Sequence, residues 1–214
     1  MKRILSLTAV AALVFTTVAS AQLMNFPVDV NPHHGNGVGI AGLFGRGLND
    51  KGFVGKATSF GAGARIGFGM INIAAGVMTN SPEGAGDSKT DFGANAEFVV
   101  IKGGASPFAA SVFAGFGTAS DFGTTIPLGV GLSVAPPGGI FSIWAAPFYQ
   151  LFSLSDCTDD CSANDFGVSG GVRLGLPMGL GFGASLQWVN REDAVGGAPI
   201  TFGGAVGWKF GLGG

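Results

Sequence analysis

LGFGASLQW, residues 180–188, carries an apolar side chain at every second position. One face of the extended chain would hold Leu180, Phe182, Ala184, Leu186 and Trp188, and the other Gly181, Gly183, Ser185 and Gln187. A period of two is that of a β-strand, whose successive side chains point to opposite faces. The stretch therefore predicts a strand with one continuous apolar face and one face of small and polar residues.

The same alternation recurs at residues 60–68, 92–100 and 200–210. In a soluble β-sandwich the outward face would carry Lys, Glu and Thr, and the bulky face would be buried. Here the less apolar face is mostly Gly, Ala and Ser, and the bulky face ends in aromatic residues. This arrangement is typical of a transmembrane barrel, in which bulky residues face lipid and small or polar residues face the lumen.

The composition excludes several other classes of protein. Of 214 residues, 40 are Gly and 19 are Phe, and 11% are charged. Soluble domains carry about 25% charged residues, and disordered chains lack this apolar content. The net charge of −2 provides no basic surface for nucleic acid, so no nucleic-acid partner is expected.

The fold predicted is an all-β, transmembrane, antiparallel up-and-down barrel. Ten strands are expected, at residues 37–46, 57–68, 70–79, 91–101, 107–116, 126–134, 140–149, 165–174, 180–189 and 200–210. Long connections near 47–56, 80–90, 117–125, 150–164 and 190–199 alternate with short ones near 68–70, 102–106, 135–139 and 175–179. An even strand count places both termini in the periplasm and the long loops outside. Eight strands is the alternative, because the turn at residues 68–70 is the weakest boundary.

Aromatic residues are expected to form two belts on the lipid face, since such rings prefer the membrane interfaces. The outer belt would contain Phe60, Phe92, Phe116, Tyr149, Phe166, Trp188 and Phe202. The periplasmic belt would contain Phe68, Phe108, Phe141, Phe182, Trp208 and Phe210.

The N-terminus predicts export. Lys2 and Arg3 precede an apolar run over residues 4–18, which ends in the small residues Ala19-Ser20-Ala21. This is the pattern of a signal peptide, residues 1–21, cleaved near Ala21. Residues 22–36 would form a periplasmic lead-in or a short plug, residues 37–210 the barrel, and residues 211–214 a C-terminal tail. The expected location is the bacterial outer membrane.

With these features, the chain resembles the small bacterial outer-membrane β-barrel proteins of the opacity-type and OmpA-like superfamily. The resemblance lies in the pattern over residues 37–210 rather than in a diagnostic motif. Such proteins usually end in an aromatic residue that the assembly machinery recognises. Val206, Trp208 and Phe210 have the expected spacing, although Gly211–Gly214 follow them. The resemblance implies outer-membrane lipid and this machinery as partners.

Few charged residues are expected to face the lumen: Arg65, Glu97, Arg173 and Lys209. They would form either an anion-favouring constriction or, the interpretation we favour, an interior ion-pair cluster, because buried charges need partners. Many inward positions are Gly, which supplies no side chain to fill a small barrel. These glycines indicate either an open lumen or a compressed, strongly coiled barrel. Leu43, Met78, Phe113, Trp144 and Phe148 would narrow it.

No catalytic site, cofactor or metal site is predicted, and we expect no enzyme. The pair His33-His34 precedes the first strand, and adjacent residues of an extended chain point apart. Cys157 and Cys161 share one exported loop and would form a local disulfide. That loop is acidic but does not follow the order of an EF-hand.

The sequence thus predicts a narrow passive channel for small ions or solutes, or a closed structural barrel. A surface-interaction or adhesion protein that acts through its outer loops is the alternative. A barrel-embedded hydrolase is not favoured, because no His lies near a nucleophile on any strand or outer loop.

Overall fold

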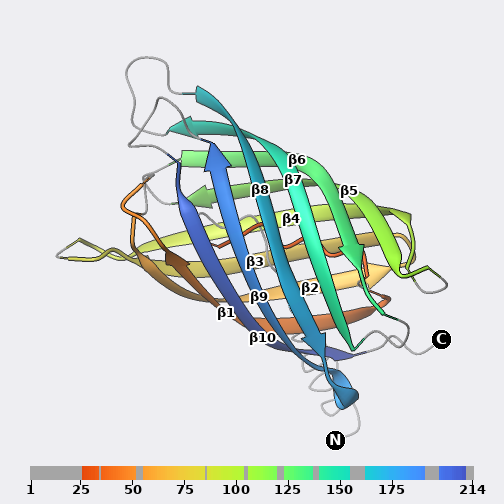
Figure 1. The fold of residues 1–214 in the computed structure, drawn as a ribbon. Helices are drawn as coiled ribbons and strands as arrows, with labels where there is room; N and C mark the ends of the chain where they lie inside the picture. The colour runs from red at the N-terminus through yellow and green to blue at the C-terminus, as the bar shows by residue number, and fades with distance from the viewer. Residues whose placement is uncertain are drawn as a thin grey trace, which may run out of the picture.

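The computed structural model describes residues 26–33, 35–51, 55–84, 86–103, 106–119, 123–136, 140–154, 162–190 and 198–210. Over these residues the chain forms a closed antiparallel barrel of ten strands (Figure 1). The strands are β1 (Gly37–Gly47), β2 (Thr58–Phe68), β3 (Ile71–Ser81), β4 (Lys89–Ile101), β5 (Phe108–Ala119), β6 (Gly123–Val134), β7 (Phe141–Leu154), β8 (Ser162–Gly175), β9 (Leu180–Asn190) and β10 (Ile200–Phe210).

The first and last strands close the barrel. β1 pairs with β10 from Val38 opposite Phe210 to Gly47 opposite Thr201. Every other pair of neighbours is consecutive in the sequence, as in an up-and-down barrel. Closure leaves no strand edge unpaired, which is the condition for a sheet within lipid. The prediction of ten strands is confirmed, and the eight-strand alternative is wrong.

The turn at residues 68–70 decides the strand count. Phe68 pairs with Ile71, so Gly69 and Met70 form a two-residue hairpin turn between β2 and β3. Gly69 has a φ of 64°, a conformation that favours glycine and suits the first position of such a turn. The chain therefore reverses direction at one glycine, in a stretch where the sequence shows little other sign of a turn.

The two ends of the barrel differ in their connections. The turn end is where the strands meet at Phe68 and Ile71, Ile101 and Phe108, Val134 and Phe141, and Gly175 and Leu180. The loop end is where they meet at Gly47 and Thr58, Ser81 and Lys89, Ala119 and Gly123, Leu154 and Ser162, and Asn190 and Ile200. The connection expected at 117–125 is shorter, because β5 and β6 remain paired up to Ala119 and Gly123. Backbone hydrogen bonds between strands do not require apolar side chains. β5 and β6 therefore stay paired beyond the part of the barrel whose outward side chains are apolar.

The outward face of the sheet is apolar. Phe60 and Phe68, at the two ends of β2, are 65% and 74% exposed. The other residues expected in the two aromatic belts are likewise exposed or half-buried. The inward face is buried and includes Leu43, Met78, Phe113, Trp144 and Phe148, as expected.

Helical structure in the described residues is limited to one 3-10 turn, Pro177–Gly179, between β8 and β9. No helix in these ranges is long and apolar enough to cross a membrane. The predicted signal peptide 1–21, the loop cysteines Cys157 and Cys161, and the tail 211–214 lie outside the described residues.

Candidate functional site

The interior of the barrel contains a segment of chain that belongs to no strand. We call residues 26–33 the luminal segment (Figure 1, red). Seven of its residues, 26–32, are buried, and Val30 has 0% exposure. Residues 22–36 were expected to be a periplasmic lead-in or a short plug; of their described part, residues 26–33 lie within the lumen, whereas Gly35 and Asn36 are exposed.

Apolar contacts hold the luminal segment at two levels. Phe26 packs with Ala41 and Leu43 of β1 and Met78 of β3. Further along, Val28 and Val30 belong to a cluster with Phe113, Trp144, Ala146, Phe148 and Val189. Burial of one Val or Phe side chain contributes about 2 kcal/mol, so the three side chains anchor the segment strongly.

Polar contacts from three strands fix the direction of the luminal segment. The Val28 N–H donates to Gln187 Oε1 at 2.8 Å, and Asn31 Nδ2 donates to Ser142 Oγ at 2.7 Å. His33 Nδ1 lies 2.6 Å from Ser133 Oγ. Ser133 and Ser142 lie at the turn end of β6 and β7, whereas Leu43 and Gly203, near Phe26, lie further toward the loop end. The segment therefore runs down the lumen to the start of β1.

Inward glycines make room for this segment. A Cβ on Gly131 would lie 2.6 Å from Val30 Cγ1, and one on Gly203 would lie 2.7 Å from Pro27 Cδ. A Cβ on Gly103 would overlap the His33 ring. Other inward glycines make room for large side chains of the wall: Gly61 for Met78, Gly129 for Phe113 and Gly167 for Phe148. At these glycines, the space that a side chain would take is filled by the luminal segment or by large side chains of the wall, not by an open pore.

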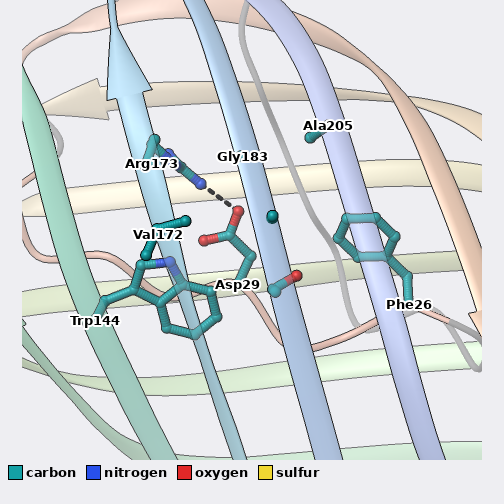
Figure 2. Close-up of a pocket in the computed structure, with 9 residues that line it drawn as sticks. Phe26, Asp29, Trp144, Val172, Arg173, Gly183 and Ala205 are labelled. Carbon is teal, nitrogen blue, oxygen red and sulfur yellow. Dashed lines mark hydrogen bonds and ion pairs between the residues drawn. The ribbon is translucent and has the colours of Figure 1, made fainter.

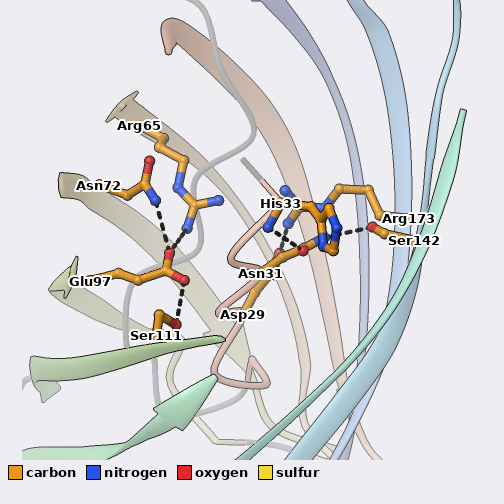
Figure 3. A network of polar contacts seen from close by, with 9 residues as sticks. All are labelled: Asp29, Asn31, His33, Arg65, Asn72, Glu97, Ser111, Ser142 and Arg173. Carbon is orange, nitrogen blue, oxygen red and sulfur yellow. Dashed lines mark hydrogen bonds and ion pairs between the residues drawn. The ribbon is translucent and has the colours of Figure 1, made fainter. Parts of the chain in front are cut away.

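Two of the four predicted lumen charges form a buried pair. Arg65 Nη2 lies 3.2 Å from Glu97 Oε2, and the side chains are 4% and 0% exposed. Glu97 also accepts hydrogen bonds from Asn72 Nδ2 at 3.2 Å and Ser111 Oγ at 2.7 Å (Figure 3). The carboxylate is therefore held from β2, β3 and β5, which meets the usual need of a buried charge.

The third predicted charge, Arg173 of β8, pairs with Asp29 of the luminal segment (Figures 2 and 3). Asp29 was not among the predicted site residues, because its segment precedes the first predicted strand and its side chain could not be assigned to the lumen. Lys209 lies at the turn end, where a Cβ on Gly35 would be 3.5 Å from its Nζ. Arg65 interacts electrostatically with Arg173 and Asp29, and Lys209 with both arginines, so the predicted charges lie close enough to influence one another. They are divided between the Arg65–Glu97 pair, the Arg173–Asp29 pair and Lys209.

Two further inward carboxylates, Asp91 of β4 and Asp165 of β8, are buried toward the loop end. Asn80 donates to Asp91 and accepts a hydrogen bond from Ser59. Asp91 is in phase with Glu97 on the same strand, so alternation could have identified it. It was missed because alternation was followed only from residue 92 onward, although the strand predicted over residues 91–101 includes Asp91.

His33 is the one described histidine. Burial lowers its pKa from the ordinary value. Its Nε2 is buried and forms no hydrogen bond within the described part of the chain. The neutral imidazole is therefore the form that suits this end of the luminal segment. Across the described ranges, no group of three or more His, Cys, Asp or Glu side chains is arranged to hold a metal ion.

A small pocket lies beside the Arg173–Asp29 pair (Figure 2). Its lining includes Phe26, Trp144 and Ser185, and it has room for about one water molecule.

Comparison with solved structures gives 16 matching chains, among them two outer-membrane barrels. The crystal structure of Neisserial surface protein A matches with a TM-score of 0.35 and 13% sequence identity, covering 81% of this chain and 96% of that one. The in-vitro folded OmpT, an outer membrane protein of Vibrio cholerae, matches with a TM-score of 0.33 and 12% identity, covering 83% and 62%. At such identities the likeness concerns the fold alone. No family model and no curated protein matches the chain.

Proposed function

We propose that this protein is an outer-membrane β-barrel that is closed to diffusion through its lumen. Burial of the luminal segment among inward side chains of the wall is the observation that supports this function best. A passive channel needs a continuous aqueous path, and residues 26–33 occupy the middle of that path. Of the two roles predicted from the sequence, the structural barrel is therefore preferred to the open pore.

The proposed location follows from the surface of the sheet. A soluble protein would have to expose the apolar residues of all ten strands to water, at a cost of about 25 cal/mol per Å². A bilayer removes this cost and also accounts for aromatic residues at both ends of the strands. Outer-membrane lipid and the barrel-assembly machinery are accordingly the proposed partners.

A second candidate function, interaction at the cell surface, is supported by charged side chains at the loop end. Arg46 pairs with Glu83 at 3.5 Å and donates to Thr58 Oγ1 at 2.9 Å. Lys56 pairs with Asp50 at 2.9 Å, and the hydrogen bond and charge of Asp50 raise the pKa of Lys56. A closed barrel can contact its surroundings only through lipid and its two ends, so this rim is where a partner would bind.

Conductance of residues 22–214, refolded in detergent and placed in a planar bilayer, tests closure. Folding is checked by a heat-dependent gel shift. We expect no steady openings from the wild-type chain. The Val28→Asp/Val30→Asp variant of the same residues 22–214 places two charges in the apolar cluster and should release the luminal segment, so openings should appear. Steady conductance of the folded wild-type protein would overturn the proposal.

A further inference from the structure

The Arg173–Asp29 pair joins the barrel wall to a segment that is not part of the wall. The Arg173 side chain is 13% exposed and that of Asp29 is 8% exposed. The Arg65–Glu97 pair, in contrast, joins two strands. The wall therefore supplies Arg173 as a partly buried cation, and a residue from outside the sheet supplies a carboxylate for it.

Inward acids of the wall are either far from Arg173 along its strand or held by other side chains. Asp165 is on the same strand, β8, eight positions earlier, which corresponds to about 26 Å of extended chain. Glu97, in the turn-end half of β4, is held by Arg65, Asn72 and Ser111. The carboxylate that pairs with Arg173 therefore comes from the luminal segment.

The surroundings of Arg173 have the features of a binding site for a small anion. Ser185 is among the residues that line the pocket beside the pair. Trp144 and Gly183 line it too, and Figure 2 shows both beside Asp29. A guanidinium binds carboxylates well because its N–H groups match the two oxygens. The site combines a partly buried cation, a hydroxyl and room for about one water molecule next to the resident carboxylate.

We infer that Arg173 forms a carboxylate-binding site in the lumen wall, and that Asp29 occupies it as an internal ligand. A carboxylate-bearing ligand takes the place of Asp29 when that side chain is absent or displaced. This inference rests on the proposed function, since it assigns a ligand class to the lumen that the luminal segment closes.

Tethering explains why the internal ligand dominates. A ligand on a short tether acts at an effective concentration of about millimolar or higher. A free carboxylate must compete with this concentration in the wild-type protein but not in a variant without the Asp29 carboxylate. The two proteins should therefore differ in their response to added acetate.

The test uses the full-length variant Asp29→Ala, which removes the carboxylate and leaves space for acetate. The readout is the temperature midpoint of the heat-dependent gel shift. We expect the midpoint of Asp29→Ala to lie below that of the wild type and to rise with acetate until it saturates. The apparent affinity for acetate should be at least tenfold tighter than in the wild type, and chloride at equal ionic strength should not restore the midpoint.

The double variant Asp29→Ala/Arg173→Gln is the matched control, and acetate should not raise its midpoint. Rescue that survives loss of Arg173, or equal rescue by chloride, would overturn the inference, as would a midpoint of Asp29→Ala equal to that of the wild type. If Asp29→Ala refolds poorly, its refolding yield with and without acetate gives the same comparison. Closure is judged separately, because a conducting wild-type barrel with intact acetate rescue would contradict only the proposed function.

Discussion

Arg65 and Glu97 meet inside the barrel across the intervening strand β3, with their charged atoms 3.2 Å apart. The two residues are not backbone partners in the sheet, since Arg65 lies opposite Ala74 and Glu97 opposite Asn72. Asn72 donates to the same carboxylate oxygen that Arg65 contacts. The Glu97 carboxylate of β4 is thus bound by side chains of β2 and β3, in addition to Ser111 of β5.

Substitution Glu97→Gln tests the importance of this link. It leaves the Arg65 charge buried without its carboxylate, and breaking a buried pair costs about 3 kcal/mol. The free energy of unfolding, measured by urea titration in lipid vesicles, should fall by that amount. Glu83→Gln removes the exposed pair with Arg46 and should cost about 0.5 kcal/mol or less. Equal effects of the two substitutions would contradict the assignment of Glu97 to a buried network.

Gly131→Ala tests the fit between wall and luminal segment. The added Cβ would lie 2.5 Å from Ser111 Oγ and 2.6 Å from Val30 Cγ1, so one of them must move. Overpacking of this kind costs about 1–3 kcal/mol, again measured by urea titration. Gly42→Ala on the outward face of β1 is the matched control, because its Cβ would meet nothing within 4 Å. A stability of Gly131→Ala equal to that of Gly42→Ala would mean that position 131 does not face the luminal segment.

Acidification should weaken docking of the luminal segment through His33. Because burial lowers the pKa of His33, protons bind more tightly to the unfolded chain. Its contribution to stability is present above the unfolded pKa of about 6.5 and is lost as the pH falls below that value. Between about pH 7.5 and about pH 5.5, the wild type should therefore lose more stability than His33→Asn, by urea titration. The same pH dependence in both proteins would show that His33 does not titrate in this way.

The strands could be predicted from the sequence because alternation is a local property. Leu180–Trp188 shows it within nine residues, and the inward direction of Arg65 and Glu97 follows from the same parity. The ends of strands were harder to predict, since pairing continues through Thr118 and Thr124 without apolar residues. The polar residues at these strand ends show no alternation of apolar and polar side chains that would mark a strand.

The luminal segment was the part that local patterns could not place. Phe26, Val28 and Val30 also alternate, but no neighbouring strand pairs with them. Their docking depends on the absence of side chains at Gly131 and Gly203, more than a hundred residues later in the chain. The same glycines are compatible with an open lumen, so the sequence alone left both interpretations open.

Disulfide trapping of Val30→Cys with Gly131→Cys, in a Cys157→Ser/Cys161→Ser background, tests the central claim most directly. The two positions are in contact across the lumen, within the Cβ separation of about 4 Å that a disulfide requires. Oxidation of the folded barrel should link them nearly completely, as read by mass spectrometry of the digested protein. The control pair Val30→Cys/Gly42→Cys should not link, because Gly42 faces outward. Two free, reagent-accessible thiols at positions 30 and 131 in the folded protein would contradict a barrel closed by its own N-terminal segment.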